Sequence, residues 1–178
     1  MALDNHILYG TISPLPDGQA LAIYYLHNEP LTKQEFTRIA TTLPGYIKAV
    51  WCPKLNELAV QYVNSTKSGI GVGTALLALC VQEGQKAGLT SVTLDDMSDR
   101  FMQEHNLYLN MGMTYKEPYL PEMIGSSETI LDCWESVKHE CINPQLQYLN
   151  SDSPESYHVE SVNTPTSQEQ ETLSFLTD

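Results

Sequence analysis

The sequence is poor in basic residues and rich in acidic ones. Its 178 residues include 9 Lys and Arg against 22 Asp and Glu, a formal net charge of -13 at pH 7. Nucleic-acid binding requires Lys and Arg that neutralise phosphates, and the chain has no basic stripe, so we expect no nucleic-acid partner. Residues 91–140 hold ten acids and three bases. A cationic partner or an amine substrate would match that half, although an acidic surface also serves solubility.

The chain also lacks a long apolar run. Its first residues, MALDNHILYG, show neither the basic segment nor the apolar core of a secretory signal. No stretch approaches the roughly 18 consecutive apolar residues of a membrane-spanning helix. We therefore expect a soluble protein without membrane contact, a monomer or homodimer in the cytoplasm. Export to a host cell by a leaderless route is the alternative.

Cysteine and histidine are too scattered to predict a metal site. The four cysteines form no CxxC pair, and the five histidines show no paired ligand spacing. Two of the cysteines lie in apolar runs, where a thiol behaves as a small hydrophobic group. Without a dense cysteine framework, a reducing compartment is the simpler expectation.

The N-terminal half predicts paired strands and one helix. Residues 7–12 and 20–26 are apolar runs that flank a Pro- and Gly-containing turn, which is typical of two connected strands. Thr32 and Glu35 form a capping box, and apolar residues then recur at helical spacing until Leu43. Residues 46–51 and 58–63 are β-prone and flank a short loop, so they predict an antiparallel pair.

The second half alternates predicted helices and strands. A leucine-rich helix is expected over residues 74–86 and a strand over 89–94. A helix of that length connects neighbouring parallel strands. An amphipathic helix over 100–111 and a strand over 129–134 complete the series. We predict an α/β fold, a mixed central sheet flanked by helices, in one domain over residues 1–142.

Residues 143–178 have a different composition. Ser, Pro, Glu, Gln, Asn and Thr dominate, and Lys and Arg are absent. So little apolar surface cannot offset the loss of chain entropy, so we expect an acidic, disordered tail. Residues 167–176, SQEQETLSFL, resemble the C-terminal export signals of type IV secretion effectors, although such signals are short and degenerate and chance composition is the better explanation.

A glycine-rich loop precedes the predicted helix at 74–86. Glycines in such a loop let the backbone approach an anion closely, and the free N–H groups and dipole of the following helix attract negative charge. Glycines also serve tight turns and close packing, so the surrounding sequence must decide. The dinucleotide fingerprint GxGxxG fails because Thr74 stands where the third glycine is needed, and the P-loop pattern also fails.

The loop resembles motif A of the GNAT acetyltransferases, Arg/Gln-x-x-Gly-x-Gly/Ala followed by a leucine-rich helix. In that family the loop amides hold the pyrophosphate of acetyl-CoA. The resemblance assigns that role to the run Lys67, Ser68, Gly69, Ile70, Gly71, Val72, Gly73 and Thr74. Ser68 departs from the family pattern, which has a basic or amide residue there.

The resemblance continues to residue 113. LTSVTLDD matches the family's next strand, and the run from Asn106 to Met113 resembles its LYxxxGF signature with Met for Phe. The family places a tyrosine beside the sulfur of CoA. The resemblance therefore makes Tyr108 the candidate general acid, although a purely structural ring is the alternative, and it places Asn106 among the cofactor-binding residues.

The resemblance also implies where the pantetheine arm binds. In the family two adjacent parallel strands separate into a V that admits this arm, and the backbone of residues Gln61 to Val63 would bind it here. Attack on the thioester requires a neutral amine, so a carboxylate usually removes a proton. Asp95 and Asp96, at the end of the predicted strand, are the candidate bases or substrate binders. Glu57 and Glu104 are further candidates, and each is more often a solvated charge.

These observations support one leading hypothesis and two alternatives. The leading hypothesis is an N-acetyltransferase that moves the acetyl group of acetyl-CoA to a primary amine, on a small molecule or on a basic protein, by direct attack in a ternary complex. The first alternative is a catalytically silent GNAT-like module that binds CoA or a protein. The second is a Rossmann-type nucleotide-binding protein.

Overall fold

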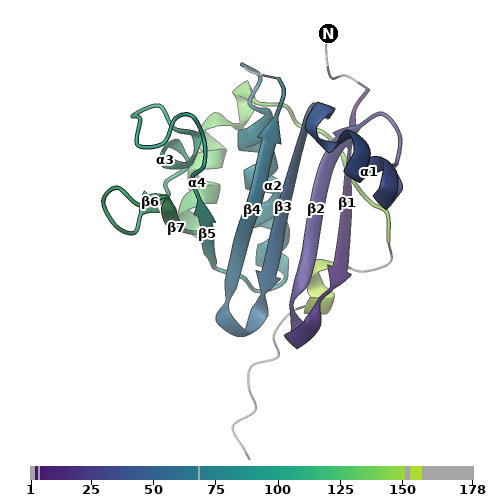
Figure 1. The fold of residues 1–178 in the computed structure, drawn as a ribbon, viewed down its shortest axis with the longest axis horizontal. Helices are drawn as coiled ribbons and strands as arrows, with labels where there is room; N and C mark the ends of the chain where they lie inside the picture. The colour runs from purple at the N-terminus through teal and green to yellow at the C-terminus, as the bar shows by residue number, and fades with distance from the viewer. Residues whose placement is uncertain (1–2, 4, 68, 151–152, 158–178) are drawn as a thin grey trace, which may run out of the picture.

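The computed structural model describes residues 3, 5–67, 69–150 and 153–157. Their centre is one eight-stranded sheet with the order β6-β7-β5-β4-β3-β2-β1-β8. Helix α1 lies in front of this sheet in Figure 1, and helices α2 and α4 lie behind it. The predicted mixed sheet flanked by helices is therefore confirmed.

The first four strands form an antiparallel meander. They are β1 (Ile7–Pro14), β2 (Ala20–His27), β3 (Gly45–Cys52) and β4 (Glu57–Ser65). Short 3-10 turns at Pro16–Gly18 and Pro53–Leu55 connect the pairs. All four strands were predicted, because β-branched and aromatic residues alternate with turn-forming residues at suitable intervals.

Helix α1 (Lys33–Ile39) begins as its capping box predicts. The Thr32 hydroxyl accepts a hydrogen bond from the Glu35 N–H, and the Glu35 carboxylate accepts one from the Thr32 N–H. The helix ends earlier than its apolar spacing suggests and continues as a 3-10 turn, Ala40–Thr42. It covers a small cluster around Tyr9, Tyr25 and Leu43.

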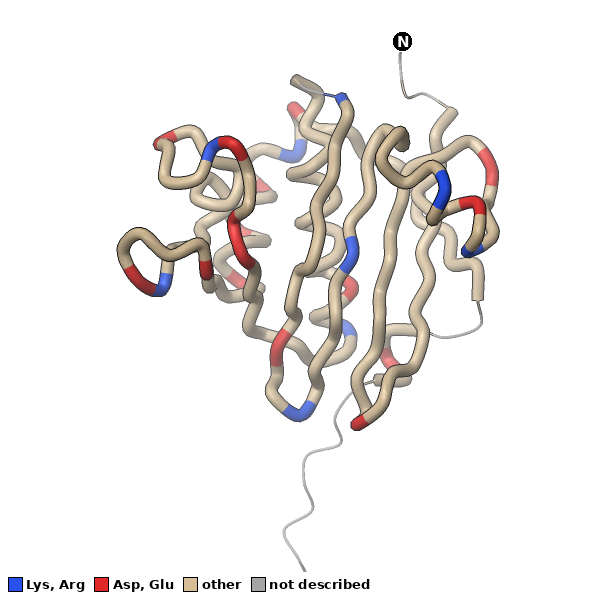
Figure 2. Tube along the Cα trace, in the orientation of Figure 1, with Lys and Arg blue, Asp and Glu red and all other residues tan. Residues whose placement is uncertain are grey.

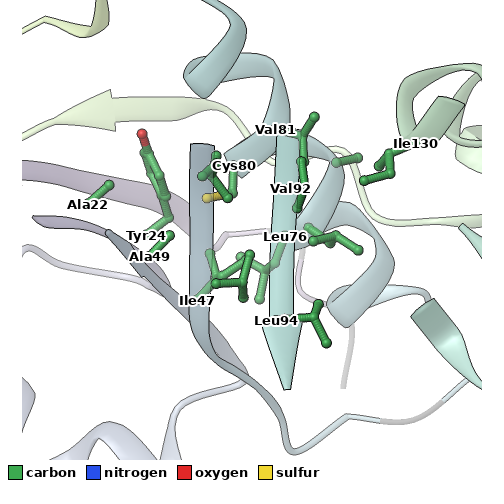
Figure 3. Packing of buried hydrophobic residues seen from close by; sticks show 14 of the residues in the cluster. Ala22, Tyr24, Ile47, Ala49, Leu76, Cys80, Val81, Val92, Leu94 and Ile130 are labelled. Atoms are coloured by element: carbon green, nitrogen blue, oxygen red, sulfur yellow. The ribbon is translucent and has the colours of Figure 1, made fainter. Parts of the chain in front are cut away.

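Helix α2 (Val72–Lys86) supplies the main core. It connects β4 to β5 (Ser91–Asp95), and these two strands run parallel, as predicted. Ten of its residues are buried, and side chains such as Leu76 and Val81 meet Val92 and Leu94 of the sheet (Figure 3). Each such aliphatic side chain contributes roughly 1.5–3 kcal/mol to folding when fully buried.

Two elements differ from the sequence prediction. The helix expected over 100–111 is only α3 (Leu107–Asn110), because Asn106 caps it and nearly all of residues 100–105 are exposed without a buried face. The strand expected over 129–134 is instead part of helix α4 (Ser127–Val137). Ile130 and Trp134, four residues apart, are buried on one side of that helix, and the Ser126 hydroxyl caps it by accepting from the Thr129 N–H.

The predicted disorder from residue 143 is wrong for the described part of that segment. β8 (Leu146–Tyr148) pairs in parallel with β1, and the 3-10 turn Pro154–Tyr157 places the Tyr157 ring against Trp51. A few apolar side chains are enough to order this segment because the open edge of β1 supplies hydrogen-bond partners for its backbone. Residues 158–178, which include the run resembling an export signal, lie outside the described residues.

Two short strands complete the other edge of the sheet. β7 (Glu122–Ser126) pairs antiparallel with β5, and β6 (Thr114–Tyr115) pairs antiparallel with β7. The loops around α3 and between β6 and β7 lie at this edge (Figure 1). Within the described residues, no helix is long and apolar enough to span a membrane.

Candidate functional site

The parallel strands β4 and β5 pair over only part of their length. Their ladder runs from Glu57↔Ser91 to Val60↔Leu94, and β5 ends one residue later, whereas β4 continues to Ser65. The β3–β4 ladder shifts register at this point, because Lys48 pairs with Tyr62 and Ala49 pairs with Val60, which leaves Gln61 as the extra residue. Among the described strands, none pairs with residues 61–65 on the β5 side. Gln61 and Val63 therefore lie on the part of β4 that continues past the end of its ladder with β5.

The glycine loop after β4 has the backbone of an anion-binding turn. Gly69 and Gly71 have φ values of 81° and 67°, in the left-handed region that favours glycine. Gly71 is the N-cap of α2, and among the described residues no side chain caps the first turn of that helix. The N–H groups of that turn and the positive end of the helix dipole favour an anionic ligand.

The flanks of the loop are polar. Lys67 is exposed, and its carbonyl oxygen accepts a hydrogen bond of 2.9 Å from the Ser65 hydroxyl. Ser68 lies outside the described residues. Ile70 is also exposed, whereas Val72 and Gly73 are buried in the first turn of α2 and Thr74 is half-buried. The loop therefore presents the side chains of Lys67 and Ile70 to solvent together with the backbone of Gly69.

The start of α2, the end of β4 and the start of α3 meet at one place. A Cβ added to Gly73 would lie 2.9 Å from Cδ1 of Leu107 and 3.8 Å from Cγ1 of Val63. A side chain at position 73 would require the end of the Leu107 side chain to shift. The close approach brings the glycine loop, the separated strand and Tyr108 into one neighbourhood.

Tyr108 keeps its proton under ordinary conditions. Burial, and secondarily the negative charge of Asp96, raises the pKa of the Tyr108 hydroxyl to about 12. Within the described part of the chain, no hydrogen bond ties this hydroxyl to another residue. A protonated hydroxyl without a hydrogen-bond partner among the described residues can donate a proton, which is the chemistry that a general acid needs.

Asp96 and Asn106 form a buried pair that holds α3. The Asn106 side-chain amide donates to the Asp96 carboxylate at 2.5 Å, and its carbonyl oxygen accepts from the N–H groups of Tyr108 and Leu109. Asp96 also accepts from the hydroxyls of Ser98 (2.5 Å) and Tyr115 (2.7 Å). Both residues are 1% exposed. Their polar atoms are committed to the protein.

The charge state of Asp96 follows from these bonds. Burial by itself would raise the pKa of the carboxyl, but the hydrogen bonds from Ser98, Tyr115 and Asn106 outweigh it and lower that pKa. A carboxylate of low pKa with several donors is a poor proton acceptor. The environment of Asp96 therefore suits a residue that positions α3, and not the base or substrate binder that the sequence suggested.

Asp95 has a different environment from its neighbour. It is the last residue of β5, exposed, and opposite Glu122 of β7. A cavity of about 150 Å³ lies where β4 and β5 separate, with Val60, Thr93, Asp95 and Glu122 in its walls. Glu57 lies on the same side of the sheet, where its carboxylate accepts from the Thr93 hydroxyl at 3.0 Å. Glu104 is exposed in the loop before α3.

The four cysteines differ in burial and share one bonding state. Cys52 and Cys80 are buried, Cys133 and Cys141 are half-buried, and all four are free thiols. Among the described residues, no group of three or more His, Cys, Asp or Glu side chains is arranged to hold a metal ion.

The sequence reasoning missed one segment at the glycine loop. Cys141 lies against Gly71, and the Ile142 N–H donates to the Ile70 carbonyl oxygen at 3.1 Å. No sequence motif marks these residues, which are about seventy positions from the loop and were expected to end the domain. The contact arises from the path of the chain after α4.

Comparisons with known proteins give distant structural similarities. No protein-family model matches the sequence, and no curated protein matches it. The nourseothricin acetyltransferase structure is similar over 64% of this chain and 69% of its own, at 16% identity and a TM-score of 0.41. A GNAT-family acetyltransferase from Staphylococcus aureus Mu50 is similar over 65% and 72%, at 12% identity and a TM-score of 0.41. A chain of the NatC complex bound to Gag peptide and CoA is similar over 62% and 72%, at 19% identity and a TM-score of 0.38. Nothing about substrate or activity follows from these values.

Proposed function

We propose that this protein is a GNAT-type N-acetyltransferase that uses acetyl-CoA and a primary amine. The observation that carries the proposal is the junction of three features at one place. The ladder between β4 and β5 ends at Val60↔Leu94, the left-handed glycines Gly69 and Gly71 lead into the uncapped start of α2, and Tyr108 stands at the adjoining start of α3. A ligand with an anionic half and an extended arm fits this combination.

Backbone groups would make most of the contacts to acetyl-CoA. A Cβ added to Gly69 would meet no atom within 4 Å, so space is open on the outer side of the loop. The loop from Lys67 to Thr74 would hold the pyrophosphate through N–H groups, and the backbone of residues 61–63 would bind the arm. The bound group would supply an acetyl thioester.

Two side chains would handle protons. Tyr108, protonated because its pKa is about 12, would donate a proton to the leaving sulfur. Asp95, exposed in the wall of the small cavity between β4, β5 and β7, would accept a proton from the incoming ammonium, directly or through water. Asp96 and Asn106 would position α3, and so Tyr108, without touching the substrates.

The acceptor is expected to be cationic. Acidic residues follow β5 and recur in the loops around α3 and β6 (Figure 2), and Asp95 and Glu122 both line the small cavity. A polyamine or a lysine of a basic protein would match this charge. Lys116 neutralises part of it by forming an ion pair with Glu122.

A matched pair of glycine variants tests the cofactor site. Gly69 and Gly18 both have positive φ, 81° and 73°, and a Cβ on either would meet nothing within 4 Å. Gly69→Asp and Gly18→Asp therefore carry similar backbone strain, but only the first places a negative charge at the start of α2. We expect calorimetry to show acetyl-CoA binding by the parent and Gly18→Asp, and at least about tenfold weaker binding by Gly69→Asp.

The same experiment distinguishes the alternatives. Absence of acetyl-CoA binding at millimolar ligand in the parent would refute the proposal, and binding of NAD in its place would favour a nucleotide-binding protein. Product formation is followed by mass spectrometry after incubation of labelled acetyl-CoA with amine mixtures and cell lysate.

One observation favours a second candidate function, a silent CoA-binding module. Asp96 is committed to structural bonds, which leaves a single exposed aspartate, Asp95, at the end of β5. Binding of acetyl-CoA without turnover of any amine or protein in the panel would support this module over the enzyme.

A further inference from the structure

A short segment of the chain braces the glycine loop from its inner side. We call residues Cys141 to Pro144 the C-terminal strap; it follows α4 and the 3-10 turn Lys138–Glu140 and leads into β8. The Ile142 N–H donates to the Ile70 carbonyl oxygen at 3.1 Å. A Cβ added to Gly71 would lie 2.3 Å from Sγ, 2.8 Å from Cβ and 3.0 Å from Cα of Cys141. The strap therefore contacts two consecutive residues of the loop, Ile70 and Gly71.

Both ends of the strap are anchored to the core. Before it, α4 buries Ile130 and Trp134 in the main core cluster, to which α2 belongs. After it, Leu146 and Tyr148 pair with Leu8 and Gly10 of β1. These fixed ends determine where Cys141 and Ile142 lie relative to the loop.

A polar lock strengthens the second anchor. The Tyr148 hydroxyl donates to the buried Glu83 carboxylate at 2.7 Å and contacts the Tyr24 hydroxyl at 2.9 Å. Lys86 forms an ion pair with the same carboxylate at 2.6 Å. The Asn150 side chain adds two hydrogen bonds to the backbone of Ile12. Removing a hydrogen-bond donor from the buried Glu83 carboxylate would cost free energy, so these bonds hold Tyr148 and β8 in place.

The strap is otherwise loosely surrounded. A cavity of about 570 Å³ lies on its α2 and α4 side, and one of about 730 Å³ lies on its β1 side, where Ile70 is also a wall residue. Ile142, Asn143 and Pro144 line both. Cys141 and Ile142 also pack against the main core cluster, and their contacts to Gly71 and Ile70 tie the glycine loop to this packed segment.

From these contacts we infer that Cys141 and Ile142 are positioning residues for the anion-binding loop. They hold the Ile70–Gly71 peptide so that the loop enters α2 with its N–H groups turned toward the ligand. This inference rests on the proposed function, because it concerns the same loop. It also gives a reason for glycine at position 71 besides its positive φ, because a side chain there would collide with Cys141 of the strap.

The test removes one backbone hydrogen-bond donor from the strap. Ile142→Pro eliminates the N–H that donates to Ile70, and Cys141 already has φ -109° and ψ 162°, an extended conformation that a following proline accepts. Ile142→Ala is the matched control, since it truncates the side chain and keeps the N–H. Binding is measured by calorimetry for acetyl-CoA and for acetyl-pantetheine, which lacks the pyrophosphate.

We expect Ile142→Pro to weaken acetyl-CoA binding by roughly 3- to 10-fold, the effect of one lost hydrogen bond, and to leave acetyl-pantetheine binding unchanged. Ile142→Ala should bind both like the parent. A general structural defect would weaken both ligands equally, and this result, or unchanged acetyl-CoA binding by a folded Ile142→Pro variant, would overturn the inference.

A second variant keeps the inference testable if Ile142→Pro does not fold. Cys141→Leu enlarges the side chain that faces Gly71 and should produce the same selective loss for acetyl-CoA. If the parent itself fails to bind acetyl-CoA, the proposed function fails and the inference fails with it. If the parent binds and both variants bind equally well, only the inference fails.

Discussion

Tyr108 is the residue whose chemistry is most directly testable. Replacement by Phe removes the hydroxyl and keeps the half-buried ring, so the start of α3 should remain in place. We expect kcat to fall by about 10²- to 10⁴-fold, while the Kd for acetyl-CoA stays within about twofold. Steady-state kinetics and calorimetry on the same preparation measure the two effects. Equal kcat values for parent and variant would remove Tyr108 from the mechanism.

The raised pKa of Tyr108 also has a consequence for pH dependence. Because that pKa is about 12, the hydroxyl remains protonated throughout the range in which the protein is handled. Loss of this proton should therefore cause no alkaline decline in kcat below about pH 10, since the ionised fraction remains small there. An alkaline limb near neutral pH would have to come from another group.

At the scale of elements, the short helix α3 depends on the carboxylate of Asp96, which accepts several hydrogen bonds. α3 has four residues and gains its stability from Asn106, which is in turn fixed by Asp96. In Asp96→Asn an amide N–H₂ would face donors from Asn106, Ser98 or Tyr115. We expect the free energy of unfolding to fall by about 2–3 kcal/mol, measured by urea denaturation.

The neighbouring aspartate is the control for this experiment. Asp95→Asn changes an exposed carboxylate, so the free energy of unfolding should change by no more than about 0.5 kcal/mol. If Asp95 is the base, kcat/KM should fall in this variant although the protein is fully stable. Equal stability of the two variants would contradict the positioning role of Asp96.

The pH dependence of stability has a defined sign for Asp96. Its pKa is lowered in the folded protein, so the stabilisation is fully present above the pKa of the unfolded carboxyl, about 3.9, and is lost as the pH falls through the lower folded value. Near neutral pH this carboxylate contributes its full stabilisation.

At the scale of the whole molecule, the sheet is completed by both ends of the described chain. β1 lies between β2 and β8, so residues near position 8 and near position 146 form one ladder. A chain that ends after Ile142 loses β8, Tyr148 and Tyr157 and leaves Glu83 with Lys86 alone. We expect a loss of about 3–5 kcal/mol and a fall in Tm of roughly 10 °C.

A chain that ends after Tyr157 provides the comparison. It keeps β8 and the packing of Tyr157 on Trp51, so its Tm should lie closer to that of the full chain than to that of the chain ending at Ile142. Differential scanning calorimetry of the three chains gives the answer. Unchanged melting of the chain ending at Ile142 would show that β8 contributes nothing to stability.

The sequence by itself determined the elements whose signals are local. The capping box of α1, the alternation of β1 to β4 and the leucine-rich α2 each depend on neighbours within a few residues, and each was predicted. The glycine loop was also visible, because positive φ values restrict residue choice at single positions. Helix α4 could have been predicted from the spacing of Ile130 and Trp134 and from Ser126, but its apolar run suggested a strand.

Only the tertiary structure decided which groups share an environment. Asp95 and Asp96 are adjacent and chemically identical, yet one is exposed and the other is buried against Asn106 and Tyr115, which come from other parts of the chain. β8 lies in a segment whose composition predicts disorder, and it is ordered because the open edge of β1 supplies hydrogen bonds and Tyr148 donates one to Glu83. Burial and long-range pairing depend on the path of the whole chain, so no local pattern in the sequence encodes them.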